Sequence, residues 1–316
     1  MAWKGADLKQ DYTTSLSTEQ LKQISDACNA YHASGRSLEV LDKSSFSIPL
    51  LADKFEAIRN DLHKGTGLCV LRGIDPSSLS MRELFITFAG LASHVSPQRA
   101  RQSGRKSIVH MTDLSENGRR VVPAPYRNSA LPFHADPGAD VVAMFVVETP
   151  TQGGEGIFCP VSTIYNKLIS TRPDLLCELA KPEWPFDPPE MVFSRGALIR
   201  SPFGYRPADI PDLTRSQNAA LDALHFAATG SMHRLLYQRG DVVFFNNRRL
   251  LHGRDGFRDG ESGKRLVLRL WLRDEQLAGV PPAPLNKVWK NTLATHDETR
   301  PSVGDDEFWP LEPCSC

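Results

Sequence analysis

Residues 265–273 alternate strictly between two kinds of side chain, and this pattern limits the folds that the chain can adopt. Successive side chains of a β-strand point to opposite faces of its sheet, so a period of two predicts a strand. A row of leucines has to be covered, most simply by helices from the N-terminal part of the chain. The even positions form that row: Leu266, Leu268, Leu270 and Leu272.

The odd positions of the same stretch place charge on the opposite face. They are Arg265, Val267, Arg269, Trp271 and Arg273. From the pattern alone, two interpretations of this face stay open. It is either a solvent-exposed basic edge, or the interior of a barrel in which guanidinium groups bind a carboxylate in bidentate fashion.

The other segments predict a mainly β core with flanking helices, an α+β protein. Residues 1–95 form a mainly helical scaffold, in which Ser17 and Ser80 begin capping boxes. The apolar run at 140–148 predicts a strand that is buried on both faces. The pattern at 235–246 predicts a β-hairpin that turns at Gly240.

Strands from both halves of the chain contribute to this core, so we predict one domain over residues 1–316. In it, residues 128–275 form the core, with a helical and loop insert at about 160–230. Residues 285–316 are predicted to be a C-terminal tail.

The composition excludes some classes of partner. Lys plus Arg and Asp plus Glu number 37 each, so no overall field attracts nucleic acid or an anionic membrane. There is no apolar signal segment and no run of 18 apolar residues, and the six cysteines form no Cys-x-x-Cys pair. We therefore expect a cytoplasmic protein with reduced thiols, no nucleic-acid partner and no membrane partner. A homo-oligomer is neither required nor excluded.

A candidate metal site is formed by His134-Ala135-Asp136 together with His252, which lies 118 residues after the first histidine. Two imidazoles and one carboxylate can occupy one face of a metal ion and leave its other positions open, as non-haem Fe(II) oxygenases require. The other histidines considered have no partner at this spacing and are interpreted as structural: His94, His110, His225 and His233.

In their order, the motifs of the chain resemble those of the taurine dioxygenase-like (TauD/TfdA) family of Fe(II)- and 2-oxoglutarate-dependent oxygenases. The resemblance is to its fungal, clavaminate synthase-like members and extends from Ala2 to about Pro284. It rests on the motifs at 131–136, 153–155, 238–241, 247, 252–257 and 264–271. The fold implied by the resemblance is a double-stranded β-helix, or jelly roll, flanked by helices.

The resemblance also implies a set of site residues. The iron ligands, and thus the catalytic centre, correspond to His134, Asp136 and His252. The arginine that binds 2-oxoglutarate corresponds to Arg265, and Arg269 corresponds to a position that contacts an anionic substrate or assists the co-substrate. We expect further lining of the substrate pocket from Phe133, Tyr205, Arg206 and Trp271.

The implied cofactors are Fe(II), 2-oxoglutarate and O₂. The implied reaction is the oxidation of a small organic molecule, such as an amino acid-like compound or a biosynthetic intermediate, with release of succinate and CO₂.

One position of the co-substrate site departs from the family. Where the family usually has a Thr or Ser that donates to 2-oxoglutarate, this chain has Gly156. A lost hydrogen bond to a charged acceptor costs roughly 1.5–3 kcal/mol, which weakens binding about tenfold to a hundredfold. Water, Arg269 or Thr163 are the candidates to compensate.

Two alternative functions stay open from the sequence. The first is an iron and O₂ enzyme of the same fold that does not use 2-oxoglutarate, which Gly156 motivates. The second is a jelly-roll protein that binds a ligand without catalysis.

Overall fold

A computed structural model describes residues 2–8, 12–102, 107–115, 122, 124–184, 193, 195–198 and 211–279. The predicted pocket residues Tyr205 and Arg206 and the predicted tail at 285–316 lie outside the described residues.

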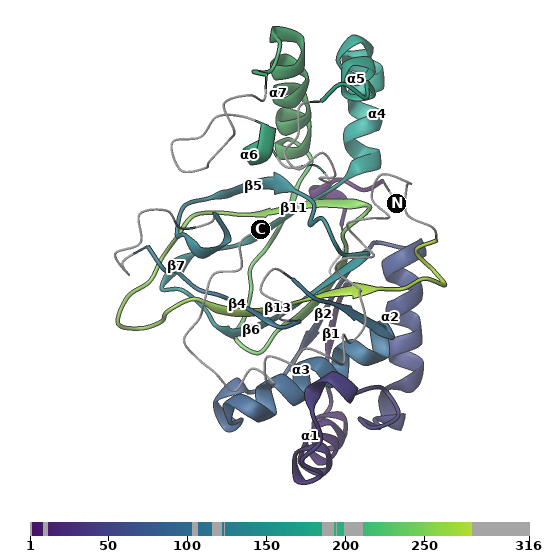
Figure 1. The fold of residues 1–316 in the computed structure, drawn as a ribbon, viewed down its shortest axis with the longest axis vertical. Coiled ribbons are helices and arrows are strands. Elements are labelled where there is room, and N and C mark those ends of the chain that lie inside the picture. Colours follow the sequence, from purple (N-terminus) through teal and green to yellow (C-terminus); the bar gives the residue numbers. More distant parts are fainter. Residues whose placement is uncertain are drawn as a thin grey trace, which may run out of the picture.

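Two β-sheets face each other at the centre of the protein (Figure 1). The larger sheet has the order β1 (Thr13–Ser15), β2 (Leu68–Arg72), β10 (Val242–Asn246), β6 (Val141–Glu148), β13 (Leu266–Arg273) and β3 (Gln98–Ala100), and β4 (Val109–Met111) also pairs with β13. The smaller sheet has the order β5 (Leu131–His134), β11 (Leu250–Arg254), β8 (Gly156–Pro160) and β9 (His233–Leu235). A separate pair is formed by β12 (Phe257–Arg258) and β7 (Gln152–Gly153).

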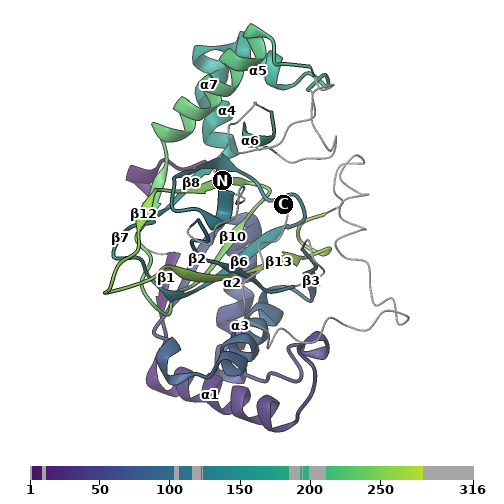
Figure 2. The same cartoon turned by 60° about the vertical axis from the view of Figure 1, so that its left-hand side comes forward.

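Helices cover the outer side of each sheet, so that four layers result (Figure 2). The larger sheet is covered by α1 (Thr18–Ala33), α2 (Ala52–Lys64) and α3 (Met81–Val95). The smaller sheet is covered by α4 (Val161–Thr171), α5 (Pro173–Leu179) and α7 (Arg215–Thr229), with the short α6 (Arg195–Leu198) near them. The 3-10 helices are η1 (Gly5–Asp7), η3 (Leu38–Val40), η4 (Pro49–Leu51), η5 (Pro76–Ser78) and η7 (Ala124–Tyr126).

The predicted capping boxes at Ser17 and Ser80 begin α1 and α3. In the part of the chain that the structure describes, no helix combines the length and apolar character needed to cross a membrane.

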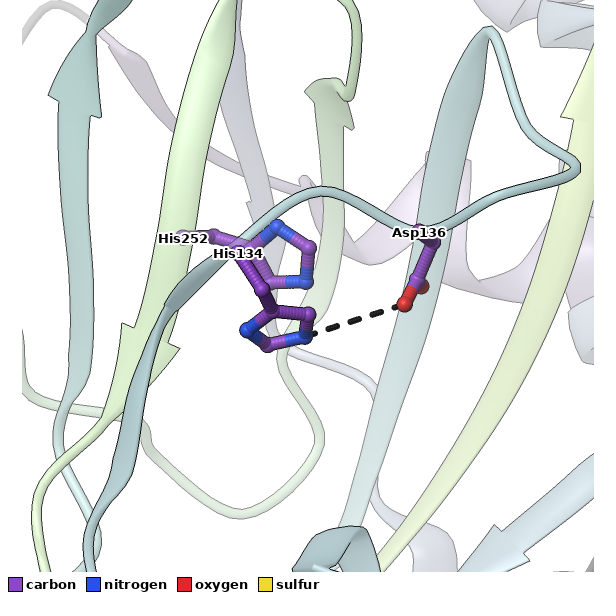
Figure 3. A group of neighbouring side chains, drawn as sticks. All are labelled: His134, Asp136 and His252. Atoms are coloured by element: carbon purple, nitrogen blue, oxygen red, sulfur yellow. Dashed lines mark ion pairs between the residues drawn. The ribbon is translucent and has the colours of Figure 1, made fainter. Parts of the chain in front are cut away.

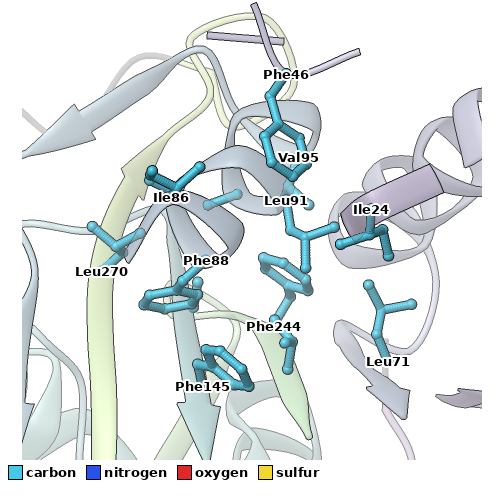
Figure 4. Packing of buried hydrophobic residues seen from close by; sticks show 14 of the residues in the cluster. Ile24, Phe46, Leu71, Ile86, Phe88, Leu91, Val95, Phe145, Phe244 and Leu270 are labelled. Carbon is cyan, nitrogen blue, oxygen red and sulfur yellow. The ribbon is translucent and has the colours of Figure 1, made fainter. Parts of the chain in front are cut away.

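The leucine face of β13 packs against the N-terminal helices, as its pattern predicted (Figure 4). Leu268, Leu270 and Leu272 are fully buried in a cluster that also contains Phe88 and Leu91 of α3. Covering these side chains removes a large apolar area from water, at roughly 25 cal/mol for each Å². This burial fixes the orientation of β13 and therefore directs its other face into the space between the sheets.

That other face lies inside the fold. Val267 and Trp271 belong to the apolar cluster between the sheets, and Arg265 and Arg269 are each only 4% exposed. The interpretation as a barrel interior is therefore confirmed, and the interpretation as a solvent-exposed basic edge is wrong. Two facing sheets with this interior form the jelly roll that the resemblance implied.

The predicted hairpin at 235–246 is wrong. Of the predicted first strand only Leu235 lies in a strand, the end of β9, which pairs with β8 in the smaller sheet, whereas β10 pairs with β2 and β6 in the larger one. The turn is present: Gly240 has a φ of +87°, and a side chain there would overlap the carbonyl of Ile74. The residues before the turn cross from one sheet to the other. A strand pairs with segments that are distant in the sequence, so a local pattern cannot show which strand its partner is.

Candidate metal centre

Three potential metal ligands meet on the interior side of the smaller sheet. One ligand atom from each of His134, Asp136 and His252 lies within 4.8 Å of the other two (Figure 3). His134 ends β5 and pairs directly with His252 in the middle of β11, so both imidazoles leave the sheet on the same face. Asp136 follows two residues after the end of β5 and turns toward them.

The two imidazoles are held differently. The Nδ1 of His134 is 2.9 Å from the carbonyl oxygen of Pro132, so the ring donates from Nδ1 and its Nε2 lone pair faces Asp136 Oδ1 at 3.7 Å. The ring of His252 lies between those of His134 and Phe245, with centroids 4.2 and 4.6 Å away. Its buried Nδ1 has no hydrogen-bond partner among the described residues.

The charge states of the three residues suit a metal cation. Burial lowers the pKa of His134, and it lowers the pKa of His252 still further, so both rings are neutral near pH 7 and keep a free lone pair. Burial by itself raises the pKa of Asp136, but the nearby Arg269 and the two histidines outweigh it, and the pKa is lowered. The set therefore offers two neutral nitrogens and one carboxylate.

The larger sheet fixes the carboxylate of Asp136 in place. The indole Nε1 of Trp271 donates to Oδ2 at 2.8 Å, and Nη1 of Arg269 lies 3.3 and 3.4 Å from the two carboxylate oxygens. The side chain of Asn247 accepts from the backbone N–H of Asp136 and donates to its carbonyl, both at 2.8 Å. Both the backbone and the carboxylate of Asp136 are thus positioned before any metal binds.

A Trp271→Phe variant is expected to weaken Fe(II) binding about tenfold to a hundredfold, because residues that hold a ligand affect metal affinity by this amount. The phenyl ring keeps most of the packing in the core between the sheets and removes only the donor to Asp136. Fe(II) titration of the metal-free protein measures the effect. Trp3→Phe, which removes an indole donor to the carbonyl of Thr66, is the control, and an equal loss in both variants would contradict the prediction.

A cavity between the sheets adjoins the two histidines of the site. Its lining includes His134 and His252 together with three arginines, Arg254, Arg265 and Arg269. Arg254 donates to the carbonyls of residues 127 and 129, and burial lowers its pKa to about 9. The cavity therefore carries an excess of positive charge.

Arg265 is the arginine of this cavity whose charge is least compensated. It is 4% exposed, and its buried Nη1 has no hydrogen-bond partner among the described residues. Its guanidinium lies 5.4 Å from the ring of Phe257. Burial lowers the pKa of Arg265 to about 10, so it remains charged at neutral pH. A buried cation with an unused donor is costly unless an anion binds to it.

Other predicted residues have contacts that differ from the expectation. Phe133 packs against the helices outside the smaller sheet, with its ring 6.2 Å from that of His225, because it alternates with His134 along β5. Its assignment to the pocket is therefore wrong. Trp271 is bonded to Asp136, which makes it a support for a ligand. Arg269 donates to Gln102, at 2.6 and 3.1 Å, as well as to Asp136, and its contact with the co-substrate stays a prediction.

Sequence reasoning missed several residues of the site. Nothing in the pattern around Gln102 or Tyr237 indicated that they would approach Arg269 and Arg265. The bond between Trp271 and Asp136 had a signal, since Trp271 shares the face of Arg269 on the predicted strand.

Two facing sheets that bring two imidazoles and one carboxylate together are typical of one class of protein, the non-haem iron oxygenases with a jelly-roll fold. The chain belongs to the taurine catabolism dioxygenase TauD, TfdA family, whose family model matches residues 34–271.

A relative agrees with this family assignment, and two solved structures share the fold. The taurine hydroxylase-like protein SAT17 of Stachybotrys chartarum is 29% identical over 99% of this chain and 88% of its own. An asparagine oxygenase, solved with Fe(II), a hydroxyasparagine and succinate, has a TM-score of 0.62 at 16% identity, covering 86% of this chain and 98% of its own. The oxygenase OrfP, solved with iron and α-ketoglutaric acid, has a TM-score of 0.56 at 15% identity, covering 82% and 93%.

The family assignment confirms the predicted enzyme class. The chain is an Fe(II)- and 2-oxoglutarate-dependent oxygenase that uses O₂, and the predicted cofactors and fold follow from it.

Proposed function

We propose that His134, Asp136 and His252 bind Fe(II) and that Arg265 binds the distal carboxylate of 2-oxoglutarate. One observation carries this proposal: Arg265, whose buried Nη1 has no hydrogen-bond partner among the described residues, lines the same cavity as the two histidines. The donors also suit the metal, since two imidazoles and a carboxylate are the ligands of non-haem Fe(II) centres with open positions.

The bound groups and the residues of the chain have different roles in the reaction. Bound Fe(II) and 2-oxoglutarate supply the chemistry, in which O₂ oxidises the substrate and 2-oxoglutarate becomes succinate and CO₂. His134, Asp136 and His252 would hold Fe(II), and the two histidines lie beside the cavity that would receive 2-oxoglutarate and the substrate. Arg265 neutralises and orients the co-substrate at the other end, and the buried interior limits the access of water.

We propose a small organic molecule as substrate. The cavity beside the metal ligands also has apolar walls, formed in part by Met111, Leu131 and Met144, and it lies between the sheets of the fold. Apolar walls with a few convergent polar groups are typical of sites that bind small molecules. We also propose that the protein is cytoplasmic, and the proposed function is compatible with a homo-oligomer.

The test is an anaerobic titration of the metal-free protein with Fe(II) and then with 2-oxoglutarate. We expect a visible charge-transfer band that saturates at one Fe(II) per chain and disappears on addition of a chelator. In air, succinate release should equal the substrate oxidised. Fe(II) binding without the band would favour an oxygenase that does not use 2-oxoglutarate, and absence of Fe(II) binding would favour a non-catalytic binding protein.

A further inference from the structure

We infer that the hydroxyl of Tyr237 replaces the hydroxyl that is missing at Gly156 and donates a hydrogen bond to the carboxylate of 2-oxoglutarate bound by Arg265. This inference rests on the proposed function, since it concerns the same co-substrate site.

Gly156 and Tyr237 are complementary in shape. Gly156 lies on the interior face of β8, where it pairs with Arg254 on one side and Leu235 on the other. A β-carbon at position 156 would overlap the hydroxyl oxygen of Tyr237 and would lie only 2.6 Å from its Cζ. No side chain fits there while Tyr237 keeps this position, so the glycine makes room for a hydroxyl that comes from another part of the chain.

The crossover between the sheets brings Tyr237 to this place. Because β9 and β10 belong to different sheets, the residues between them span the interior, and the ring of Tyr237 packs against the core between the sheets. Tyr237 lines the cavity together with Arg265 and His252. The guanidinium of Arg265 and the ring of Tyr237, which carries the hydroxyl, therefore line the same cavity.

The hydroxyl of Tyr237 is available to a ligand. Tyr237 is half-buried, and its hydroxyl has no hydrogen-bond partner among the described residues. Burial raises the pKa of Tyr237 against the effect of Arg265 and Arg254, so the group stays protonated and remains a donor. A cation beside a neutral donor is a suitable pair for one carboxylate.

The other candidates to compensate for Gly156 are engaged elsewhere. The hydroxyl of Thr163 donates to the carbonyl of Trp3 at 2.7 Å, on the outer side of the smaller sheet. The guanidinium of Arg269 donates to Gln102 and Asp136. Of the groups considered, the Tyr237 hydroxyl is the donor that shares both the space over Gly156 and the cavity of Arg265.

A Tyr237→Phe variant tests the inference because it removes only the hydroxyl. Tyr237 and Arg265 also line a second cavity, of about 190 Å³, so the ring has to be kept in order to keep the wall between the two cavities. In the anaerobic charge-transfer titration we expect the affinity for 2-oxoglutarate to fall about tenfold to a hundredfold. The affinity for Fe(II) alone should not change, and Tyr165→Phe, an exposed tyrosine on α4, is the matched control.

Binding of a second 2-oxo acid distinguishes a hydrogen bond from Tyr237 to the distal carboxylate from a purely structural role of Tyr237. In 2-oxopentanoate a methyl group replaces the distal carboxylate, so its affinity should be equal in the Tyr237→Phe variant and the unaltered protein. Equal weakening of both compounds would overturn the inference, as would unchanged binding of 2-oxoglutarate. If the unaltered protein gave no charge-transfer band, the proposed function itself would fail, which is a different result.

Variants that move the hydroxyl from position 237 to position 156 provide a second test of the inference if Tyr237→Phe folds poorly. Tyr237→Leu should weaken 2-oxoglutarate binding, and Gly156→Thr added to it should restore most of the affinity, because the leucine removes the overlap with the tyrosine and a small shift of the Phe158 ring, 2.9 Å from the β-carbon, then makes room for the usual hydroxyl. Gly156→Thr alone should weaken binding, since it collides with Tyr237. Failure of the double variant to bind more tightly than Tyr237→Leu would overturn the inference.

Discussion

A His252→Ala variant is expected to lose Fe(II) binding and to turn over at least about a thousandfold more slowly than the unaltered enzyme, which corresponds to roughly 4 kcal/mol of lost transition-state stabilisation. Only two of the three proposed ligands remain, and neither can replace an imidazole that leaves from the middle of β11. Metal content after reconstitution, the charge-transfer band and succinate release measure the loss.

The same variant is expected to keep its fold. His252 is neutral near pH 7, since burial lowers its pKa well below the usual value, so its removal leaves no buried charge without a partner. Asp136→Ala is less informative, because it would leave Arg269 and the indole of Trp271 without their carboxylate in the interior.

His110→Ala is the matched control for His252→Ala. His110 is also a buried histidine on a strand, and its ring packs 5.4 Å from that of Phe85 on the outer side of the larger sheet. Both variants should lose a similar amount of thermal stability, but only His252→Ala should lose iron. Iron binding that survives in His252→Ala, or is lost in both variants, would contradict the ligand assignment.

Local periodicity predicted the parts of the fold that depend on which face of an element is buried. The alternation at 265–273 placed the leucines toward the helices and the arginines on the opposite face, because a strand has only two faces, but the pattern alone left open whether that opposite face was interior. The same rule would have excluded Phe133 from the pocket, since it neighbours His134 on β5. Strand pairing is not local, and the hairpin at 235–246 was therefore predicted wrongly.

The candidate site also divides into residues that the sequence indicated and residues that it did not. His134, Asp136 and His252 were found because a metal needs particular side chains at particular spacings. Tyr237 was missed because the only sign of it was the absence of a side chain at Gly156, which lies 81 residues earlier in the chain. A glycine where a functional group is expected can thus mark the place that a distant side chain fills.

An Arg265→Met variant is expected to weaken 2-oxoglutarate binding between about 100-fold and several thousandfold. Two charge-assisted hydrogen bonds to one carboxylate contribute about 3–5 kcal/mol together. Arg265 is buried and its Nη1 has no partner among the described residues, so a loss of the guanidinium leaves the distal carboxylate without the cation that neutralises it, although the Tyr237 hydroxyl remains as a donor. The charge-transfer titration measures this effect, and Fe(II) binding alone should be unchanged.

The stability of the ligand-free protein gives this prediction a second readout. Arg265 places a desolvated charge in the interior, as the lowering of its pKa to about 10 indicates, so Arg265→Met should leave thermal stability without ligand equal or higher. Arg254→Met is the contrasting variant: its guanidinium donates to three backbone carbonyls, and its loss should cost about 1–3 kcal/mol. Addition of 2-oxoglutarate and Fe(II) should stabilise the unaltered protein more than Arg265→Met. Two results together would contradict the prediction: Arg265→Met destabilises the ligand-free protein as much as Arg254→Met does, and 2-oxoglutarate still stabilises Arg265→Met fully. Arg265 would then be a structural residue, and the co-substrate carboxylate would bind elsewhere.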